Sequence, residues 1–151
     1  MGVSFTAMTE ALDGKRPIRV TDSIIPVIPS SLSGHDRERW IELAARILNE
    51  YPTVRQSEMS GERRYRLGTG IGAIRIKTTK GYVYPTFQFE ENGGVHWLVR
   101  VSALSLRDDL ARGDWWTKPN ESLSGKIPAS LLGTRRPSEE LRALVISLQS
   151  N

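Results

Sequence analysis

The spacing of apolar residues changes twice along the chain, and this change constrains the fold more than any other feature. Residues 40 to 48 carry apolar side chains three or four positions apart, at Trp40, Leu43, Ala44, Ile47 and Leu48. This is the spacing of one helix face. From residue 63 to 89 apolar and polar residues alternate as in a half-buried strand, and after residue 94 the helical spacing returns. The sequence therefore predicts an α+β fold with a short antiparallel hairpin region in the middle, a helical C-terminal half and one amphipathic helix in the N-terminal half.

The N-terminal helix is expected over residues 35 to 50. Ser33 and Asp36 precede its apolar face in capping-box-like spacing. Pro52 ends it, because the residue before a proline avoids the α region. A short polar helix is expected next, from 53 to 60. The alternating region then predicts two or three short strands, with a break at Thr79-Lys80-Gly81.

Three further helical segments are expected in the C-terminal half. Residues 97 to about 112 predict one helix or two shorter ones. Pro128 suits the first turn of another helix, which runs through Leu132, because the missing N–H of proline has no helical partner there. The last helix begins after the N-cap Ser138. Its apolar stripe consists of Leu141, Leu144, Val145 and Leu148.

A chain of 151 residues has the length of one ordinary domain or two very small ones. We divide it into three parts. Residues 1–34 form a partly ordered N-terminal arm, in which Pro26 and Pro29 confine a short apolar stretch to an edge strand or an extended segment. Residues 35–81 form a small helix-plus-hairpin region that is a candidate for DNA binding, and residues 82–151 form the second folded region.

The residue inventory argues against an enzyme. The chain has no cysteine, which excludes thiol catalysis and a disulfide framework. His35 and His96 have no second histidine at helical spacing, and no nucleophile elbow or phosphate-binding loop is present. We expect no catalytic residue, no metal and no cofactor. The N-terminus lacks a signal-peptide pattern and no apolar run is long enough for a bilayer, so we expect a cytoplasmic protein without a membrane partner.

Basic residues cluster in the middle of the chain, whose net charge is +4. A basic cluster attracts polyanions, although one of this size is more often a solvated surface, so both interpretations stay open. In a winged or shortened helix-turn-helix, these side chains would contact phosphates or bases. The candidate nucleic-acid-binding residues are Arg55, Arg63, Arg64, Arg66, Lys77 and Lys80.

Residues 113–132, GDWWTKPNESLSGKIPASLL, place two adjacent tryptophans where no nucleophile, base or metal ligand is visible. The arrangement Trp115-Trp116-x-x-Pro119-Asn120-x-x-Leu123-x-Gly125-x-x-Pro128-x-x-Leu131-Leu132, followed by an amphipathic helix, resembles the C-terminal toxin-binding domain of Xre/MbcA/ParS-type antitoxins. The preceding YPTFQF, residues 84–89, resembles the lead-in to that domain. The resemblance covers residues 82 to 149.

The resemblance implies that residues 82–151 are an antitoxin-like toxin-binding domain of a type II toxin-antitoxin system. Antitoxins of this kind neutralise toxins of the RES fold, which consume NAD or ADP-ribosylate a target, and many also bind operator DNA through an N-terminal helix-turn-helix. A RES-domain toxin is therefore the implied partner, operator DNA is a second candidate, and a homo-oligomer or a hetero-oligomer with the toxin is expected. The residues implied to contact the toxin or to support the binding surface are Trp115, Trp116, Pro119, Asn120, Leu123 and Pro128. Arg135 and Arg136, just before the last helix, are further candidates for toxin contact through an acidic or phosphate-lined cleft, and a solvated loop is an equally open interpretation.

An alternative interpretation comes from the N-terminal half. A helix-turn-helix needs several helices with a basic recognition helix, whereas the sequence predicts one firm helix followed by strands. The alternative is a nucleic-acid-binding regulator or mobile-element protein that uses the same C-terminal fold for dimerisation or docking. Two adjacent tryptophans are also difficult to bury fully in so small a domain, so we expect one of them to face a partner.

Overall fold

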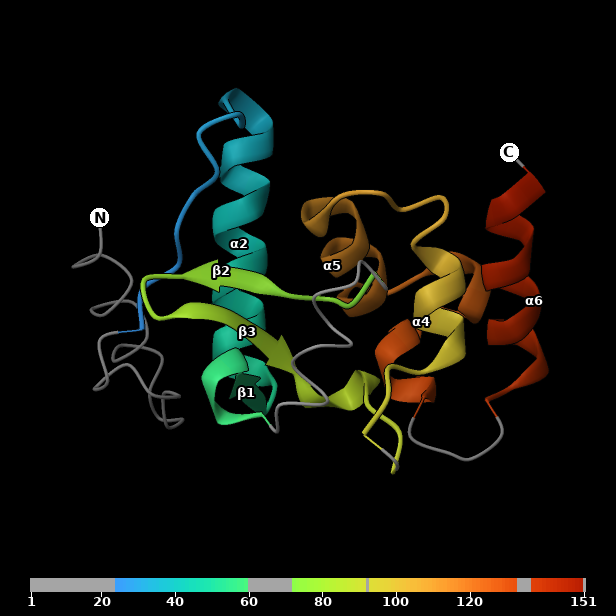
Figure 1. Ribbon diagram of the computed structural model, residues 1–151. Helices are drawn as coiled ribbons and strands as arrows, with labels where there is room; N and C mark the ends of the chain where they lie inside the picture. The colour runs from blue at the N-terminus through green and yellow to red at the C-terminus, as the bar shows by residue number, and fades with distance from the viewer. Residues whose placement is uncertain (1–23, 60–71, 92, 133–136, 151) are drawn as a thin grey trace. The chain divides into compact units, whose positions relative to one another are not determined.

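The computed structural model describes residues 24–59, 72–91, 93–132 and 137–150 (Figure 1). These residues contain four α-helices and one three-stranded antiparallel sheet, which confirms the predicted α+β fold. The chain forms two compact units. The described residues of the first are 24–58 and 75–85, and those of the second are 59, 72–74, 86–91, 93–132 and 137–150. The domain boundary predicted between residues 81 and 82 thus lies inside a strand of the first unit.

Helix α2, Gly34–Glu50, is the main helix of the first unit. The five apolar residues that predicted it are all buried, and Tyr51 ends it in an extended conformation as expected before Pro52. The predicted capping box is wrong. Ser33 occupies the N-cap position without a side-chain hydrogen bond, and the carboxylate of Asp36 instead lies 3.3 Å from the Arg39 guanidinium.

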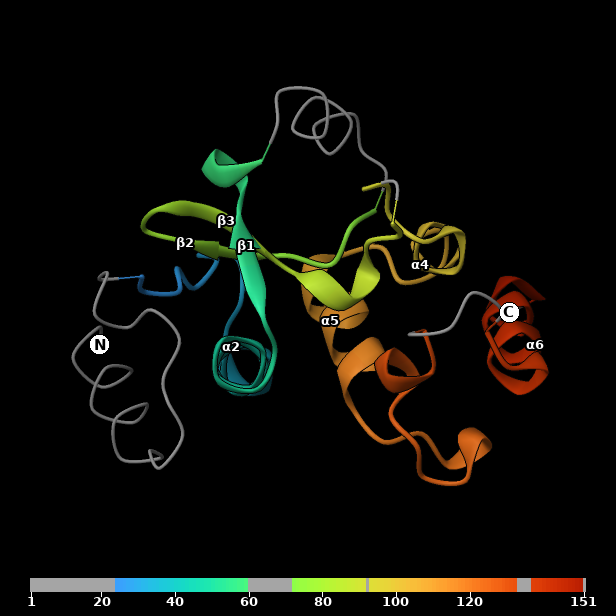
Figure 2. The same cartoon turned by 90° about the horizontal axis from the view of Figure 1, so that it is seen from below.

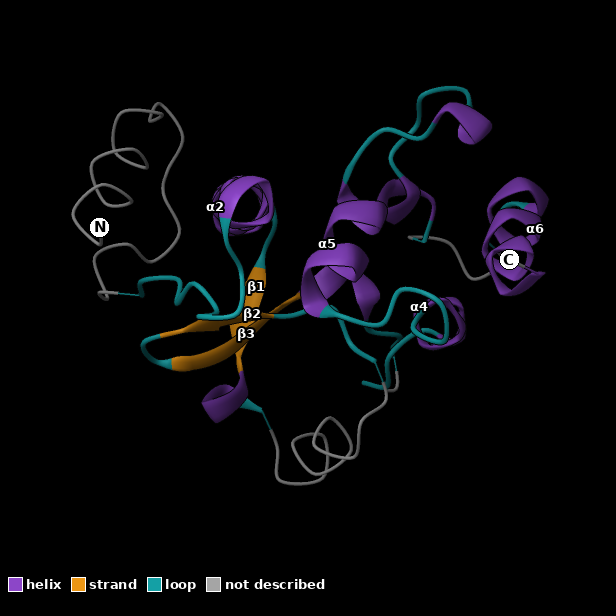
Figure 3. Cartoon of the chain, turned by 90° about the horizontal axis from the view of Figure 1, so that it is seen from above, coloured by secondary structure: helices purple, strands orange, loops and turns teal. Residues whose placement is uncertain are grey.

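The sheet of the first unit has the strand order β1-β3-β2. Strands β2, Ile76–Thr78, and β3, Gly81–Pro85, form the predicted hairpin, and β1, Thr53–Arg55, pairs with the other edge of β3. The hydroxyl of Thr78 donates to the Gly81 carbonyl at 2.6 Å and accepts the Lys80 N–H at 3.1 Å. These two bonds close the predicted turn. Figures 2 and 3 show α2 on one side of the sheet and the 3-10 turn η2, Gln56–Glu58, on the other.

The polar helix predicted for residues 53 to 60 is wrong over its first half. Residues 53–55 pair with β3, with Thr53 opposite Pro85 and Arg55 opposite Val83. The chain then turns, because the Glu58 carboxylate accepts the Arg55 N–H at 2.8 Å. Pairing with a strand almost thirty residues away therefore overrides the local helical preference.

Residues 24–29 extend the sheet beyond β2, which agrees with the predicted edge position. Pro26 bridges Thr78, the Val27 N–H donates to the Lys77 carbonyl, and the Thr79 N–H donates to the Ile25 carbonyl, both at 2.9 Å. Pro26 has no N–H to donate and is tolerated at a sheet edge. Residues 1–23 of the predicted arm lie outside the described residues.

The second unit contains α4, Trp97–Ser102, α5, Asp109–Thr117, and α6, Glu139–Ser147, with the 3-10 turns η3, Thr86–Gln88, η4, Glu121–Leu123, η5, Pro128–Leu131, and η6, Leu148–Ser150. The predicted cap of the last helix is confirmed, since the Ser138 hydroxyl accepts the Leu141 N–H at 3.2 Å. Pro128 takes the first position of η5 as predicted. The segment expected to form one helix or two up to about Arg112 forms two, α4 and α5. The Asp108 side chain caps the start of α5 by accepting the Ala111 N–H at 2.7 Å, and α5 extends beyond the expected end to Thr117.

Two sets of contacts hold the second unit together. Gln88 is fully buried, and its side-chain amide binds both backbone groups of Ile74 at 2.7 Å, which fixes residues 72–74 to η3. Helices α4 and α6 lie side by side (Figures 1 and 2). The Ser105 hydroxyl donates to the Leu148 carbonyl at 2.9 Å, which ties the end of α6 to the turn after α4. No helix in the described ranges is long and apolar enough to span a bilayer.

Candidate protein-binding surface

The two tryptophans of α5 have different roles. Trp116 is 0% exposed, and its indole N–H donates to the Ser102 hydroxyl at 2.9 Å. The ring of the half-buried Trp115 meets it edge to face, with 4.9 Å between ring centroids. Trp116 therefore supports the surface from within the core and has no exposed area for a partner. Trp115 is the one that reaches the surface, in line with the expectation that the pair is not fully buried.

The predicted Asn120 turn is closed by the Asn120 side chain. Its amide oxygen accepts the Ser122 N–H at 2.9 Å, while its backbone exchanges bonds with Gly125 and Lys126. Ser124 and Gly125 have φ angles of 58° and 80°, the left-handed region that favours glycine. Asn120 therefore folds residues 120–126 into a compact loop.

The loop is anchored to the helices by apolar residues. Leu123 is buried and its turn η4 contacts α6, whereas Pro128 is buried and its turn η5 contacts α5. Pro119 stays exposed. Five polar side chains between the motif residues are exposed: Lys118, Glu121, Ser122, Ser124 and Lys126. The motif thus builds a scaffold with a polar outer surface.

Charged residues within α5 are buried and paired, which the sequence did not indicate. Arg112 is almost fully buried, and its guanidinium lies 3.3 Å from the Asp109 carboxylate. The buried Asp114 carboxylate lies 3.5 Å from the Lys118 ammonium. Buried charges need partners of this kind. The two ion pairs therefore stabilise α5 and the residue that follows it.

Exposed apolar side chains are the part of the surface that sequence analysis missed. Among the described residues the large ones are Leu104 at 65%, Ile146 at 47% and Trp97 at 36% exposure, all in the second unit. Leu104 and Trp97 appeared in the sequence as part of an apolar helical stripe. In the structure α4 ends at Ser102 and Leu104 stands in the following turn, beside the Ser105 bond to the end of α6. Leu104 and Ile146 therefore lie at the same end of the α4–α6 pair.

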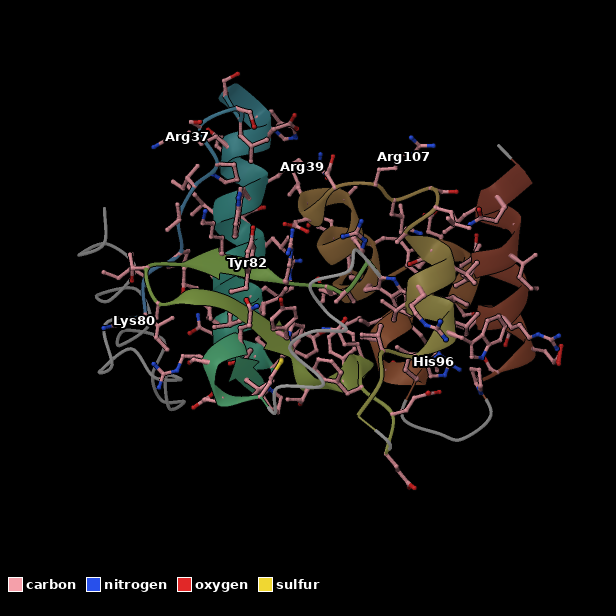
Figure 4. All side chains as sticks on the ribbon, in the orientation of Figure 1. Arg37, Arg39, Lys80, Tyr82, His96 and Arg107 are labelled. Carbon is pink, nitrogen blue, oxygen red and sulfur yellow. The ribbon has the colours of Figure 1, made fainter. Side chains whose placement is uncertain are left out.

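The side chain of His96 caps the start of α4. Its Nδ1 accepts the Leu98 N–H at 3.1 Å, and its own backbone N–H donates to the Gln88 carbonyl at 2.7 Å (Figure 4). Burial lowers the pKa of the imidazole below its ordinary value, although the nearby Glu90 acts in the opposite direction. Within the described ranges no group of three or more His, Asp or Glu side chains could hold a metal ion.

The remaining predicted site residues belong to other segments. Lys77 is exposed on β2, Lys80 lies in the hairpin turn, and Arg55 of β1 lies 3.7 Å from the Glu58 carboxylate. The structure brings Lys77 and Lys80 together on one hairpin. Five predicted residues lie outside the described residues: Arg63, Arg64, Arg66, Arg135 and Arg136.

Comparison with known proteins adds no assignment: no family model, curated protein or solved structure matches the chain.

Proposed function

We propose that the chain is an antitoxin-like protein whose second unit binds and neutralises a RES-domain toxin that consumes NAD or ADP-ribosylates a target. The observation that carries the proposal is the role of the motif residues. Trp116, Leu123 and Pro128 are buried, Asn120 closes its loop and Gly125 supplies a left-handed turn. These five motif residues each have a structural role, so the motif encodes a scaffold, as a toxin-binding domain needs.

The exposed apolar residues of the second unit supply the contact surface in this proposal. Leu104 and Ile146 project into solvent at one end of the α4–α6 pair, and Trp97 is exposed at the start of α4. Exposed apolar side chains gain free energy when a partner covers them, and aromatic residues are enriched at the centres of interfaces. Such a surface suits the mouth of an enzyme cleft.

The test uses the full chain and the RES-domain enzyme encoded beside it in its genome. NAD consumption by that enzyme is measured against increasing amounts of the chain, and complex formation is measured by co-purification. We expect stoichiometric inhibition. The double variant Leu104→Asp/Ile146→Asp should weaken inhibition at least ~10-fold, because a charge buried at an interface loses its hydration.

The matched control is Ser31→Asp, which adds a charge at an exposed position of the first unit. This variant should inhibit as the parent does, and all variants should show the parent circular dichroism spectrum. Absence of a RES-domain enzyme in the neighbouring reading frame, or inhibition that is unaffected by the double variant, would count against the proposal.

A further inference from the structure

The β2–β3 hairpin of the first unit carries positive charge without acidic residues. Residues 75–85 include Arg75, Lys77 and Lys80 and no Asp or Glu. The ion pairs described for this unit lie elsewhere, on α2 and between β1 and η2. Within the described part of the chain, Lys77 and Lys80 have no carboxylate at ion-pair distance. Lys77 and Lys80 therefore present positive charge to solvent.

Two of these cations converge on one aromatic ring. Lys77 pairs with Tyr82 across the hairpin, and its ammonium lies 5.9 Å from the centroid of the Tyr82 ring. The Arg75 guanidinium carbon lies 4.0 Å from the same centroid. Each cation is attracted to the ring, but two like charges over one ring repel each other. An anion bound between them removes this repulsion.

This cationic and aromatic surface lies on the outer side of the hairpin. Ile76 and Val83 oppose each other in the register and are buried, so their neighbours Lys77 and Tyr82 point to the other face. Lys80 stands at the tip of the hairpin, and Figure 4 shows it apart from Tyr82. The four residues Arg75, Lys77, Lys80 and Tyr82 are called the hairpin face below.

We propose that the hairpin face binds single-stranded nucleic acid. Residues two apart on a strand are separated by about 6.6 Å, so Arg75 and Lys77 are spaced to contact successive phosphates of an extended strand, and Lys80 continues the line. Tyr82 and the guanidinium plane of Arg75 offer a platform on which an unpaired base stacks. A duplex hides its base faces, and an acidic peptide has no base to stack, so the combination of charge and ring favours the single strand.

The test measures fluorescence anisotropy of a dye-labelled mixed-sequence single-stranded oligonucleotide titrated with the full chain. The double variant Lys77→Gln/Lys80→Gln should weaken binding at least ~10-fold at low salt, and the slope of log affinity against log salt should fall by about 1.4, because each lost phosphate contact on a single strand contributes about 0.7. The control Arg107→Gln/Lys126→Gln removes the same charge from exposed positions of the second unit and should leave binding within about twofold.

A variant of Tyr82 distinguishes the contribution of base stacking to binding from the contribution of charge. The Tyr82→Leu variant should bind the oligonucleotide more weakly than the parent, yet bind inorganic polyphosphate equally well, because polyphosphate has no base. Circular dichroism melting establishes that each variant is folded. Equal losses in the two double variants would overturn the proposal, and so would tighter binding to a duplex or to polyglutamate, or no binding at low salt.

The proposal concerns a different unit from the toxin-binding surface and stands independently of it. Lys77→Gln/Lys80→Gln should therefore inhibit a RES-domain enzyme as well as the parent does, while Leu104→Asp/Ile146→Asp should keep the parent affinity for the oligonucleotide. The failure of one proposal is thus visible without the failure of the other.

Discussion

The hydrogen bond between Trp116 and Ser102 allows a direct test of the role assigned to the tryptophan pair. Both residues are fully buried, the indole N–H lies 2.9 Å from the serine oxygen, and the serine hydroxyl in turn donates to the Val99 carbonyl at 2.7 Å. Ser102→Ala removes the acceptor and leaves a buried N–H without a partner. This change should lower the free energy of unfolding by about 1–3 kcal/mol.

A double-mutant cycle isolates the contribution of that bond. Trp116→Phe removes the donor together with part of the buried ring, and Ser102 keeps Val99 as its acceptor, so the hydroxyl stays satisfied. In the Trp116→Phe background, Ser102→Ala should therefore cost less than in the parent, by about 0.5–1.5 kcal/mol. Trp116→Ala should cost about 3–5 kcal/mol, since it leaves a large cavity.

The assay is urea denaturation followed by far-ultraviolet circular dichroism, because the other tryptophans complicate fluorescence. The slope of the unfolding free energy against urea concentration should be the same for all variants. Shifts of the urea midpoint of unfolding then report changes in stability. Trp115→Phe is the matched control and should cost less than Trp116→Phe, since Trp115 is only half-buried. Zero coupling in the cycle, or a larger loss from Trp115→Phe, would refute the assignment of Trp116 to the core.

Three further predictions concern the second unit. Burial lowers the pKa of His96 in the folded protein, so the unfolded chain takes up the proton more readily. The free energy of unfolding should therefore fall as the pH drops from about 7.5 to about 5. The variant His96→Asn still caps the Leu98 N–H but does not titrate, so it should flatten a plot of melting temperature against pH. Gly72 has a φ of +78° and an added Cβ would overlap the Cβ of Ala103. Gly72→Ala should lower the unfolding free energy, measured in urea, by more than ~1 kcal/mol. Adding Ala103→Gly to this variant should restore only the part of the loss that comes from the overlap of the two Cβ atoms, because the cost of the positive φ remains. Asn120→Ala should cost about 0.5–2 kcal/mol by thermal melting, and Asn120→Asp should recover most of that loss because aspartate caps equally well.

Local sequence signals predicted the elements that need no distant partner. The apolar stripe of α2, its end before Pro52, the Ser138 cap and the first-turn position of Pro128 all appear as expected. The turn at residues 79–81 and the Asn120 loop also follow from side chains that bond to their own neighbouring backbone. In the caps and turns the stabilising group lies within a few residues of the group it satisfies.

Predictions failed where a longer-range or competing interaction decided the outcome. Residues 53–55 are strand because β3 offers them a pairing edge, and Ser33 makes no cap although its spacing is suitable. Helix α5 begins after its Asp108 cap and extends through both tryptophans to Thr117, beyond the expected end. The pairing of β1 with β3 joins segments far apart in the sequence, which short-range signals do not report.

The sequence by itself determined the fold class, most helix positions and the polar loop that separates the tryptophans from η5, since these depend on periodicity, proline geometry and short-range hydrogen bonds. Only the tertiary structure decided which apolar residues are core and which are surface. Trp116 and Leu104 are both large apolar residues of the C-terminal half, yet Trp116 is completely buried and Leu104 is 65% exposed. Burial depends on which elements pack over a side chain, and that packing is a property of the assembled units and not of any single segment.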